Sequence, residues 1–248
     1  MTIKVYPKSV QHIGGFNGGE IIENKPIQLS GDGKLQPYSN IFYWVHASSE
    51  KGSTIGEHPH KVFEILSFVI EGEIEHFDSK NRIWIPLKTG DVQIIRAGSG
   101  ISHMEKLGAG AVMFQIWFDP DIIKAINAPA SYNDYPSDAF PVIKSDGLTK
   151  KIYAGKDSPL EMTARGVKIF EVMFDKGSHT INTNHDEINS CYLIDGEIEV
   201  SKNLITKNDF FMAENENEIS FNAKNKGKIF VIQSPAKVPY ETYAQRYI

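Results

Sequence analysis

Apolar residues fall in short runs separated by turn-forming residues along most of the chain. The clearest runs are 40–46, 62–70, 91–95 and 111–118, which are rich in β-branched and aromatic residues. The run 62–70 is apolar on both faces, which is typical of a strand in the middle of a sandwich. Frequent turn signals between the runs predict an all-β fold, either a sandwich or a barrel.

The pattern changes after Asp119. Residues 121–127 have the spacing of two helical turns, and residues 128–160 carry four prolines among many Ser, Asn and Asp residues. Such a composition predicts a surface segment that links two cores. Strand-like runs restart at residues 167–174.

The chain contains two versions of one unit. Residues 68–75 match residues 192–199 at an offset of 124, with five of the eight positions identical. An internal repeat changes the expected fold, because two β domains of one type explain it better than one large sheet. We therefore expect an N-terminal domain at 1–127, a linker at 128–160 and a C-terminal domain at 161–248.

Composition excludes several classes of protein. The 248 residues are 41% hydrophobic and 23% charged, with a net charge of −5. No basic cluster is present, so direct nucleic-acid binding is not expected. No run approaches the ~18 apolar residues of a membrane span, and the start lacks an apolar signal core. With Cys191 as the only cysteine, no intrachain disulfide can form, and we expect a cytoplasmic protein.

Two pairs of polar residues stand at the ends of β-rich runs. His58 and His60 form a His-x-His pair, and His103 and Glu105 have the same spacing. Strand side chains alternate with a period of two, so each pair projects from one face of its strand. Two such pairs on facing strands place three imidazoles and a carboxylate around one point. This predicts a transition-metal site, with Fe(II), Mn, Ni, Cu or Zn as candidates.

The repeat separates the metal site from the scaffold. At the offset of 124, residues 58–60 fall on 182–184, which read Asn-Thr-Asn, and Glu64 falls on Ile188. Alignment of Asp91 with Asp209 places Phe221 opposite His103 and Ala223 opposite Glu105. His179 and His185 have no metal-binding motif around them. The second copy keeps the fold signals without the ligands, so we expect one metal site, in the N-terminal half.

These motifs resemble a known family. The cupin pattern Gly-x5-His-x-His-x3-Glu, followed later by Gly, is matched by five residues: Gly52, His58, His60, Glu64 and Gly72. The longer spacing to Gly72 resembles the pirin family of bicupins. Further pirin-like pieces lie at 71–79, 90–94, 97–105 and 115–117, so the resemblance covers roughly residues 40–135.

The resemblance implies a fold and a ligand set. Pirins have two cupin barrels (double-stranded β-helix, or jelly-roll) in tandem, with one iron in the N-terminal barrel. By that resemblance the metal ligands here are His58, His60, His103 and Glu105, and the metal is Fe(II). Glu64 binds the metal in many other cupins, so it is the alternative carboxylate ligand, and its expected role here is to support the site from the pocket wall. Departures from the pirin pattern at residues 61–62, at Ser99 and at Met104 surround the site and bear on the substrate.

The resemblance also implies activities. Some bacterial pirins act on quercetin as 2,3-dioxygenases, so the favoured function is a dioxygenase that uses O2 on a flavonol or another enolisable aromatic compound, with Glu105 as the catalytic base. The first alternative is a regulatory module that is not an enzyme and binds a protein partner according to the redox state of its metal. A different metalloenzyme, such as an isomerase or a hydrolase, is the second alternative. His46, His76, Gln115 and Trp117 are second-tier candidates: His76 is expected to be structural, Trp117 to lie in the core, and Gln115 is a candidate to point into the barrel, as half of all strand residues do.

Overall fold

The computed structural model describes residues 2–28, 34–145, 147–243 and 245. The chain forms two compact units, each built of antiparallel sheet, as predicted for two barrels. One unit comprises His12–Ala139 and Pro239–Ile248, and is called here the metal barrel. The other comprises Met1–Gln11 and Phe140–Val238, and is called here the second barrel.

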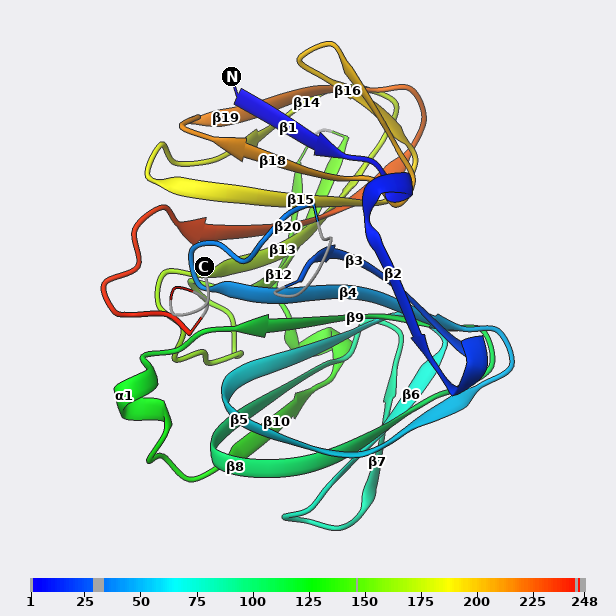
Figure 1. The fold of residues 1–248 in the computed structure, drawn as a ribbon. Coiled ribbons are helices and arrows are strands. Elements are labelled where there is room, and N and C mark those ends of the chain that lie inside the picture. Colours follow the sequence, from blue (N-terminus) through cyan, green and yellow to red (C-terminus); the bar gives the residue numbers. More distant parts are fainter. Residues whose placement is uncertain (1, 29–33, 146, 244, 246–248) are drawn as a thin grey trace. The chain divides into compact units, whose positions relative to one another are not determined.

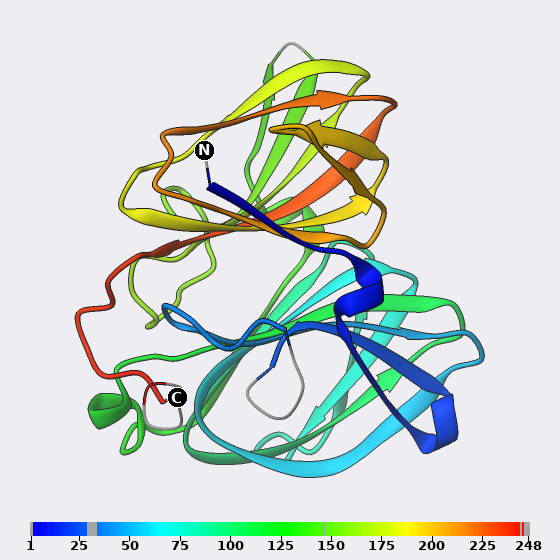
Figure 2. The ribbon, with the colours of Figure 1, turned by 45° about the horizontal axis from the view of Figure 1, so that its top comes forward.

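A nine-stranded sheet forms the metal barrel in the described part of the chain. Strands β5 and β8 are long and curve strongly, so that one sheet wraps around a single interior (Figures 1 and 2). In spatial order the strands are β2 (His12–Phe16), β3 (Ile21–Ile27), β4 (Ile41–Ser49), β9 (Ala111–Phe118), β5 (Ser53–Glu71), β8 (Val92–Leu107), β6 (Glu73–Asp78) and β7 (Trp84–Lys88), with β10 (Ser131–Tyr135) added on β8.

The second barrel has two sheets among the described residues. The larger runs in the order β1 (Thr2–Tyr6), β18 (Phe210–Glu214), β15 (Glu187–Asp195), β20 (Gly227–Pro235), β13 (Lys168–Phe174), β12 (Leu148–Ala154) and β11 (Val142–Ser145). The smaller sheet has the order β14 (Gly177–Asn182), β19 (Glu218–Ala223), β16 (Glu197–Val200) and β17 (Asn203–Thr206). Its interior is an apolar cluster that includes Phe170, Phe174, Phe211 and Phe221.

Helix is confined to short pieces in the described ranges. The single α-helix, α1 (Ile122–Ala125), is one turn long, shorter than the two turns expected for residues 121–127. Three 3-10 helices lie at Lys8–Val10, Asn17–Gly19 and Ser137–Ala139. None of the helices in the described residues is long and apolar enough to cross a membrane.

The structure places the domain boundaries differently from the expected 1–127, 128–160 and 161–248. Strand β1 pairs with β18 and so joins the second barrel, where the two lie side by side in Figure 1. Near the C-terminus, the Tyr240 hydroxyl donates to the carbonyl of Asp119 at 2.8 Å, within the metal barrel. Each terminal segment therefore completes a barrel that is distant from it in sequence.

The expected linker at 128–160 contains three strands, β10, β11 and β12. Strand β10 pairs with β8 in the metal barrel, whereas β11 and β12 pair with each other in the second barrel. The residues of β11 are all exposed, and those of β10 are exposed or half-buried. Edge strands of this kind show little apolar alternation, which is why composition alone predicts a linker here.

Candidate metal centre

Two β-bulges turn the His-x-His segment toward the barrel interior. Ile55 pairs with Glu105, and His58 pairs with His103, so β5 advances by three residues while β8 advances by two. The extra residue on β5 shifts the alternation, and it puts His58 on the face that carries His103. A second bulge follows between His60 and Val62, this time with the extra residue on β8.

The second bulge requires left-handed backbone on both strands. Val62 has φ of +72°, and its partner Gly98 has φ of +52°. A Cβ on Gly98 would lie 2.4 Å from the carbonyl oxygen of Ala128, so only glycine fits there. A β-branched residue at positive φ is strained, and such strain is typical of functional sites. Gly98 thus allows β8 to adopt the left-handed backbone that this bulge requires.

Three histidines converge as predicted. The candidate ligand nitrogens of His58, His60 and His103 all lie within 4.8 Å of one another. His103 Nε2 lies 2.9 Å from Nε2 of His58 and 3.0 Å from Nε2 of His60. His58 Nδ1 donates to the carbonyl of Gly56 at 2.8 Å, so the lone pair of this imidazole is on Nε2, facing the other two.

Electrostatics keep the imidazoles of His60 and His103 in the neutral form that binds metals. Burial, together with His58, lowers the pKa of His60 to about 4. Burial, together with the neighbouring histidines, lowers the pKa of His103 to about 2. Neutral imidazole nitrogens are ligands for divalent first-row metals, and three of them aimed at one point leave positions open for another ligand. The three histidines therefore form a site suited to a divalent metal.

Glu105 lies beside this group but is not part of it. Its side chain is 3% exposed, and its Oε1 accepts hydrogen bonds from Gln115 Nε2 at 2.6 Å and from Ser67 Oγ at 3.4 Å. Burial raises the pKa of Glu105, and the hydrogen bond from Gln115 lowers it. That Glu105 is the fourth ligand stays a prediction.

Glu64 lies in a different environment. It is 1% exposed, and its Oε1 lies 3.8 Å from Nε of Arg96, its cross-strand neighbour. Glu64 is absent from the group of convergent ligand atoms in the described residues. Its ion pair with Arg96 accords with a supporting role.

His76 lies closer to the centre than expected. Its ring is 5.4 Å from that of His103, and its Nδ1 lies 3.0 Å from Nε2 of Gln93. Gln93 Nε2 also donates to Asp134 on β10 at 2.6 Å. Burial lowers the pKa of His76 to about 4. His46, by contrast, packs its ring against Phe114 at 5.6 Å, as a structural residue does.

An aromatic wall borders the histidines. The ring of Trp117 packs against His60 at 4.8 Å, almost perpendicular to it, and against Tyr43 at 4.8 Å. Burial raises the pKa of the Tyr43 phenol, and the charges of Glu23 and Glu105 raise it further. Trp117 thus contacts a candidate ligand, in addition to the structural role expected for it.

Gln115, a second-tier candidate from the sequence, belongs to a row of buried polar residues whose other members, Ser67 and Gln93, sequence reasoning missed. Ser67 on β5 pairs with Gln93 on β8 and with Gln115 on β9, and the three side chains are 2%, 1% and 6% exposed. Each of them interrupts an apolar strand, and that interruption is the signal that identifies them. Buried polar groups need partners, and here the partners are Glu105 and His76.

The second barrel has a different arrangement at the corresponding place. His179 pairs with Phe221 across β14 and β19, as His58 pairs with His103 across β5 and β8. His179 is thus the counterpart of His58, which corrects the alignment of residues 58–60 with 182–184. The offset of 124 fails there because the segment before β15 has a different length. His179 Nε2 lies 2.7 Å from the carbonyl of Asp175.

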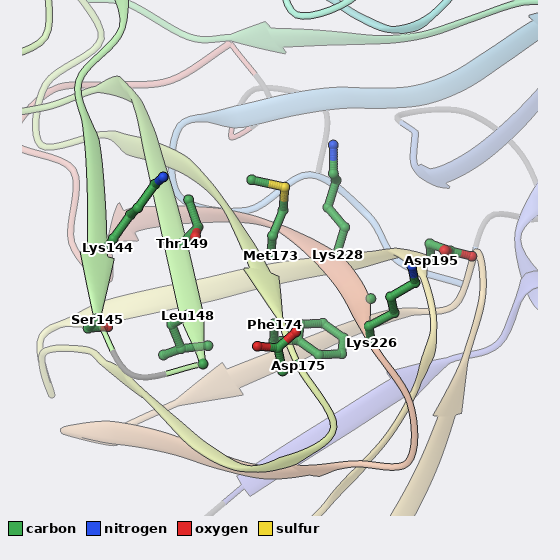
Figure 3. A pocket seen from close by; sticks show the side chains of 12 residues that line it. Lys144, Ser145, Leu148, Thr149, Met173, Phe174, Asp175, Asp195, Lys226 and Lys228 are labelled. Atoms are coloured by element: carbon green, nitrogen blue, oxygen red, sulfur yellow. The ribbon is translucent and has the colours of Figure 1, made fainter.

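A cavity of about 410 Å³ also lies in the second barrel. Met173 stands between the side chains of Lys144 and Lys228, and Asp175 and Asp195 supply opposite charge (Figure 3). Among the described residues, the group of three metal-binding side chains is His58, His60 and His103. This cavity therefore has no comparable set of metal ligands in the described ranges.

Comparisons with known proteins match these features. The family model described as Pirin matches residues 35–118. A quercetin 2,3-dioxygenase of Escherichia coli K12 is 42% identical over 76 residues, which are 29% of this chain and 32% of that protein. A pirin-like protein of Caulobacter vibrioides is 27% identical over 159 residues, covering 60% of this chain and 57% of that protein.

The fold of the whole chain is shared with solved structures. The bacterial pirin YhhW of Escherichia coli, in complex with nickel(II), has a TM-score of 0.79 and 20% identity, covering 95% of this chain and 100% of that one. A quercetin 2,3-dioxygenase of Acinetobacter baumannii has a TM-score of 0.80 and 20% identity, covering 94% and 79%. The chain is therefore an all-β protein of two cupin barrels, and the resemblance to the pirin family is confirmed over residues 35–118.

Proposed function

We propose that the protein is a mononuclear metal-dependent dioxygenase acting on a flavonol such as quercetin, or on another enolisable aromatic compound. The observation that carries the proposal is the convergence of His58, His60 and His103 beside the buried carboxylate of Glu105. Similarity to quercetin 2,3-dioxygenases supports the reaction, although the matched segment spans only about a third of the Escherichia coli enzyme. A cytoplasmic location stays a prediction.

The proposed ligands are the three histidines and Glu105, through its Oε2. Both hydrogen bonds to this carboxylate, from Gln115 and from Ser67, are made to Oε1. Iron(II) is the metal that the pirin resemblance favours, while a structural relative holds nickel(II). Mn, Cu and Zn also suit nitrogen and oxygen ligands.

The residues around the site suit a planar substrate with an acidic hydroxyl. Trp117 packs against His60, and Tyr43 packs against Trp117, so aromatic side chains border the proposed site. A bound divalent metal supplies the Lewis acidity that favours ionisation of the substrate hydroxyl. Glu105, buried beside the three histidines, is the group that accepts that proton. The resulting enolate reacts with O2, and the ring opens with loss of CO.

The test is an aerobic assay of iron-loaded protein with quercetin, following loss of flavonol absorbance and release of CO. Glu105→Gln is expected to retain metal at saturating metal concentration, because three histidines remain, and to lose turnover by about 100-fold or more. His179→Ala, in the second barrel, is the matched control and should turn over normally. No CO release from metal-loaded protein would contradict the proposal, and oxidation-dependent binding of a protein partner without turnover would favour the regulatory alternative.

A further inference from the structure

The orientation of the Gln115 amide is fixed by its neighbours. The indole Nε1–H of Trp117 can only donate, and it lies 3.1 Å from Oε1 of Gln115. The carbonyl end of the amide must therefore face Trp117. The NH2 end then faces Glu105, and Gln115 Nε2 donates to Oε1 of that carboxylate at 2.6 Å.

Trp117 contacts two residues of the site, Gln115 and His60. Its N–H orients Gln115, and its ring packs against that of His60 at an interplanar angle of 80°. Gln115 and Trp117 stand two residues apart on β9, so both project from the same face of that strand. One strand thus supports a histidine and a carboxylate that come from two other strands, β5 and β8.

The two carboxylate oxygens of Glu105 differ in their hydrogen bonding. Oε1 accepts from Gln115 and from Ser67. Oε2 is thereby left as the oxygen that can turn toward the histidines. Groups that hold a ligand in this way commonly change metal affinity by about 10- to 100-fold when removed.

We infer that Gln115 and Trp117 are positioning residues of the metal centre. Trp117 orients the amide of Gln115, Gln115 holds Oε1 of Glu105, and Oε2 is thereby presented to the metal as a single-oxygen ligand. This inference rests on the proposed function in one respect, the assignment of Glu105 as a ligand. It adds two residues of β9 whose side chains set the carboxylate geometry.

The experiment is a titration of metal-free protein with Co(II), followed by the visible d–d absorption that reports ligand type and geometry. Gln115→Leu should bind Co(II) about 10- to 100-fold more weakly, and its spectrum should shift toward that of Glu105→Gln. Trp117→Phe keeps the ring against His60 and removes the N–H, so a roughly threefold to tenfold weaker affinity is expected. Thermal unfolding of each metal-free variant verifies that it folds.

Gln233→Leu is the matched control. Gln233 is 3% exposed in the second barrel, where its Nε2 donates to Asn189 Oδ1 at 3.0 Å. Its loss should lower stability and leave the Co(II) spectrum and affinity unchanged. Wild-type spectra and affinities in both Gln115→Leu and Trp117→Phe would overturn this inference and leave the proposed function standing. A wild-type protein that binds no Co(II) would overturn the proposed function and the inference together.

Discussion

The two barrels share a strand arrangement and differ in what fills it. In the metal barrel, His58 faces His103 and His60 faces Ile101 across β5 and β8. In the second barrel, the corresponding pairs are His179 with Phe221 and Ile181 with Ile219, across β14 and β19. One histidine persists in the second barrel, yet its cross-strand partner is an aromatic core residue.

The difference shows which side chains make the fold and which make the site. Phe221, Ile181 and Phe174 belong to a continuous apolar cluster, and packing of that kind is sufficient to hold a barrel together. In the metal barrel, His103 and Glu105 stand where the second barrel has Phe221 and Ala223, and the row Ser67, Gln93 and Gln115 hydrogen-bonds Glu105 and His76. The metal barrel thus replaces apolar core residues at these positions with polar side chains, and buried polar side chains need hydrogen-bonding partners of their own.

The comparison is tested most strongly by removing one ligand. His103→Ala should reduce bound metal from about one per chain to less than about 0.1, because the loss of a structural ligand costs several kcal/mol. Metal analysis after purification without chelator measures this. His179→Ala, the counterpart histidine of the second barrel, should keep full metal content. An equal loss in both variants would contradict the assignment of the site to one barrel.

The second barrel should respond to truncation of its core instead. Phe221→Ala removes an aromatic side chain that is 3% exposed, and a cost of about 3–5 kcal/mol in the free energy of unfolding is expected. Urea denaturation followed by circular dichroism gives that value. Bound metal should stay at the wild-type level, and a loss of metal without a loss of stability would show that Phe221 belongs to a metal site.

The buried histidines of the metal barrel predict a pH dependence. The pKa of His60 and of His76 is about 4 in the folded protein and near 6.5 in the unfolded chain. Between these values the unfolded chain binds protons that the folded protein does not. The free energy of unfolding of the metal-free protein should therefore fall as the pH drops from about 6.5 to 4, by roughly 2–3 kcal/mol for each of these two histidines.

Urea unfolding at several pH values measures this slope. The variant His76→Gln keeps a polar side chain and removes one of the titrating imidazoles, so its slope should be shallower than that of the wild type. Equal slopes for the two proteins would mean that His76 does not contribute.

The smallest effect is expected at the strained residue beside the ligands. Val62→Gly relieves the positive φ and loses some apolar burial, so the net change in the free energy of unfolding should stay within about 1 kcal/mol. Val69, on the same strand and 2% exposed, has no positive φ. Val69→Gly should cost about 2–4 kcal/mol. Equal costs in the two variants would show that Val62 is not strained.

The sequence predicts the local features of this protein well. The runs at 62–70 and 111–118 lie in strands, and the run at 40–46 does so from Ile41 onward, because alternating or continuous apolar runs are local signals. The convergence of the three histidines also follows from spacing, since a period of two determines which side chains share a face.

Features set by long-range pairing are not in the sequence pattern. The pairing of β1 with β18 and the contact of Tyr240 with Asp119 join segments about 120 to 210 residues apart, and no local signal encodes them. The two bulges that turn His58 toward His103 arise from how β5 and β8 pair. Gln93 and Ser67 are visible in the sequence as polar residues inside apolar runs, but their partners are known only from the fold.

The most direct test of the account is an anomalous-scattering map, measured at the absorption edge of the bound metal in crystals of the metal-loaded protein. The account predicts one peak per chain, about 2.0–2.2 Å from Nε2 of His58, His60 and His103. An oxygen of Glu105 should complete the set. A peak beside His179 in the second barrel, or a metal bound without the three histidines, would contradict it.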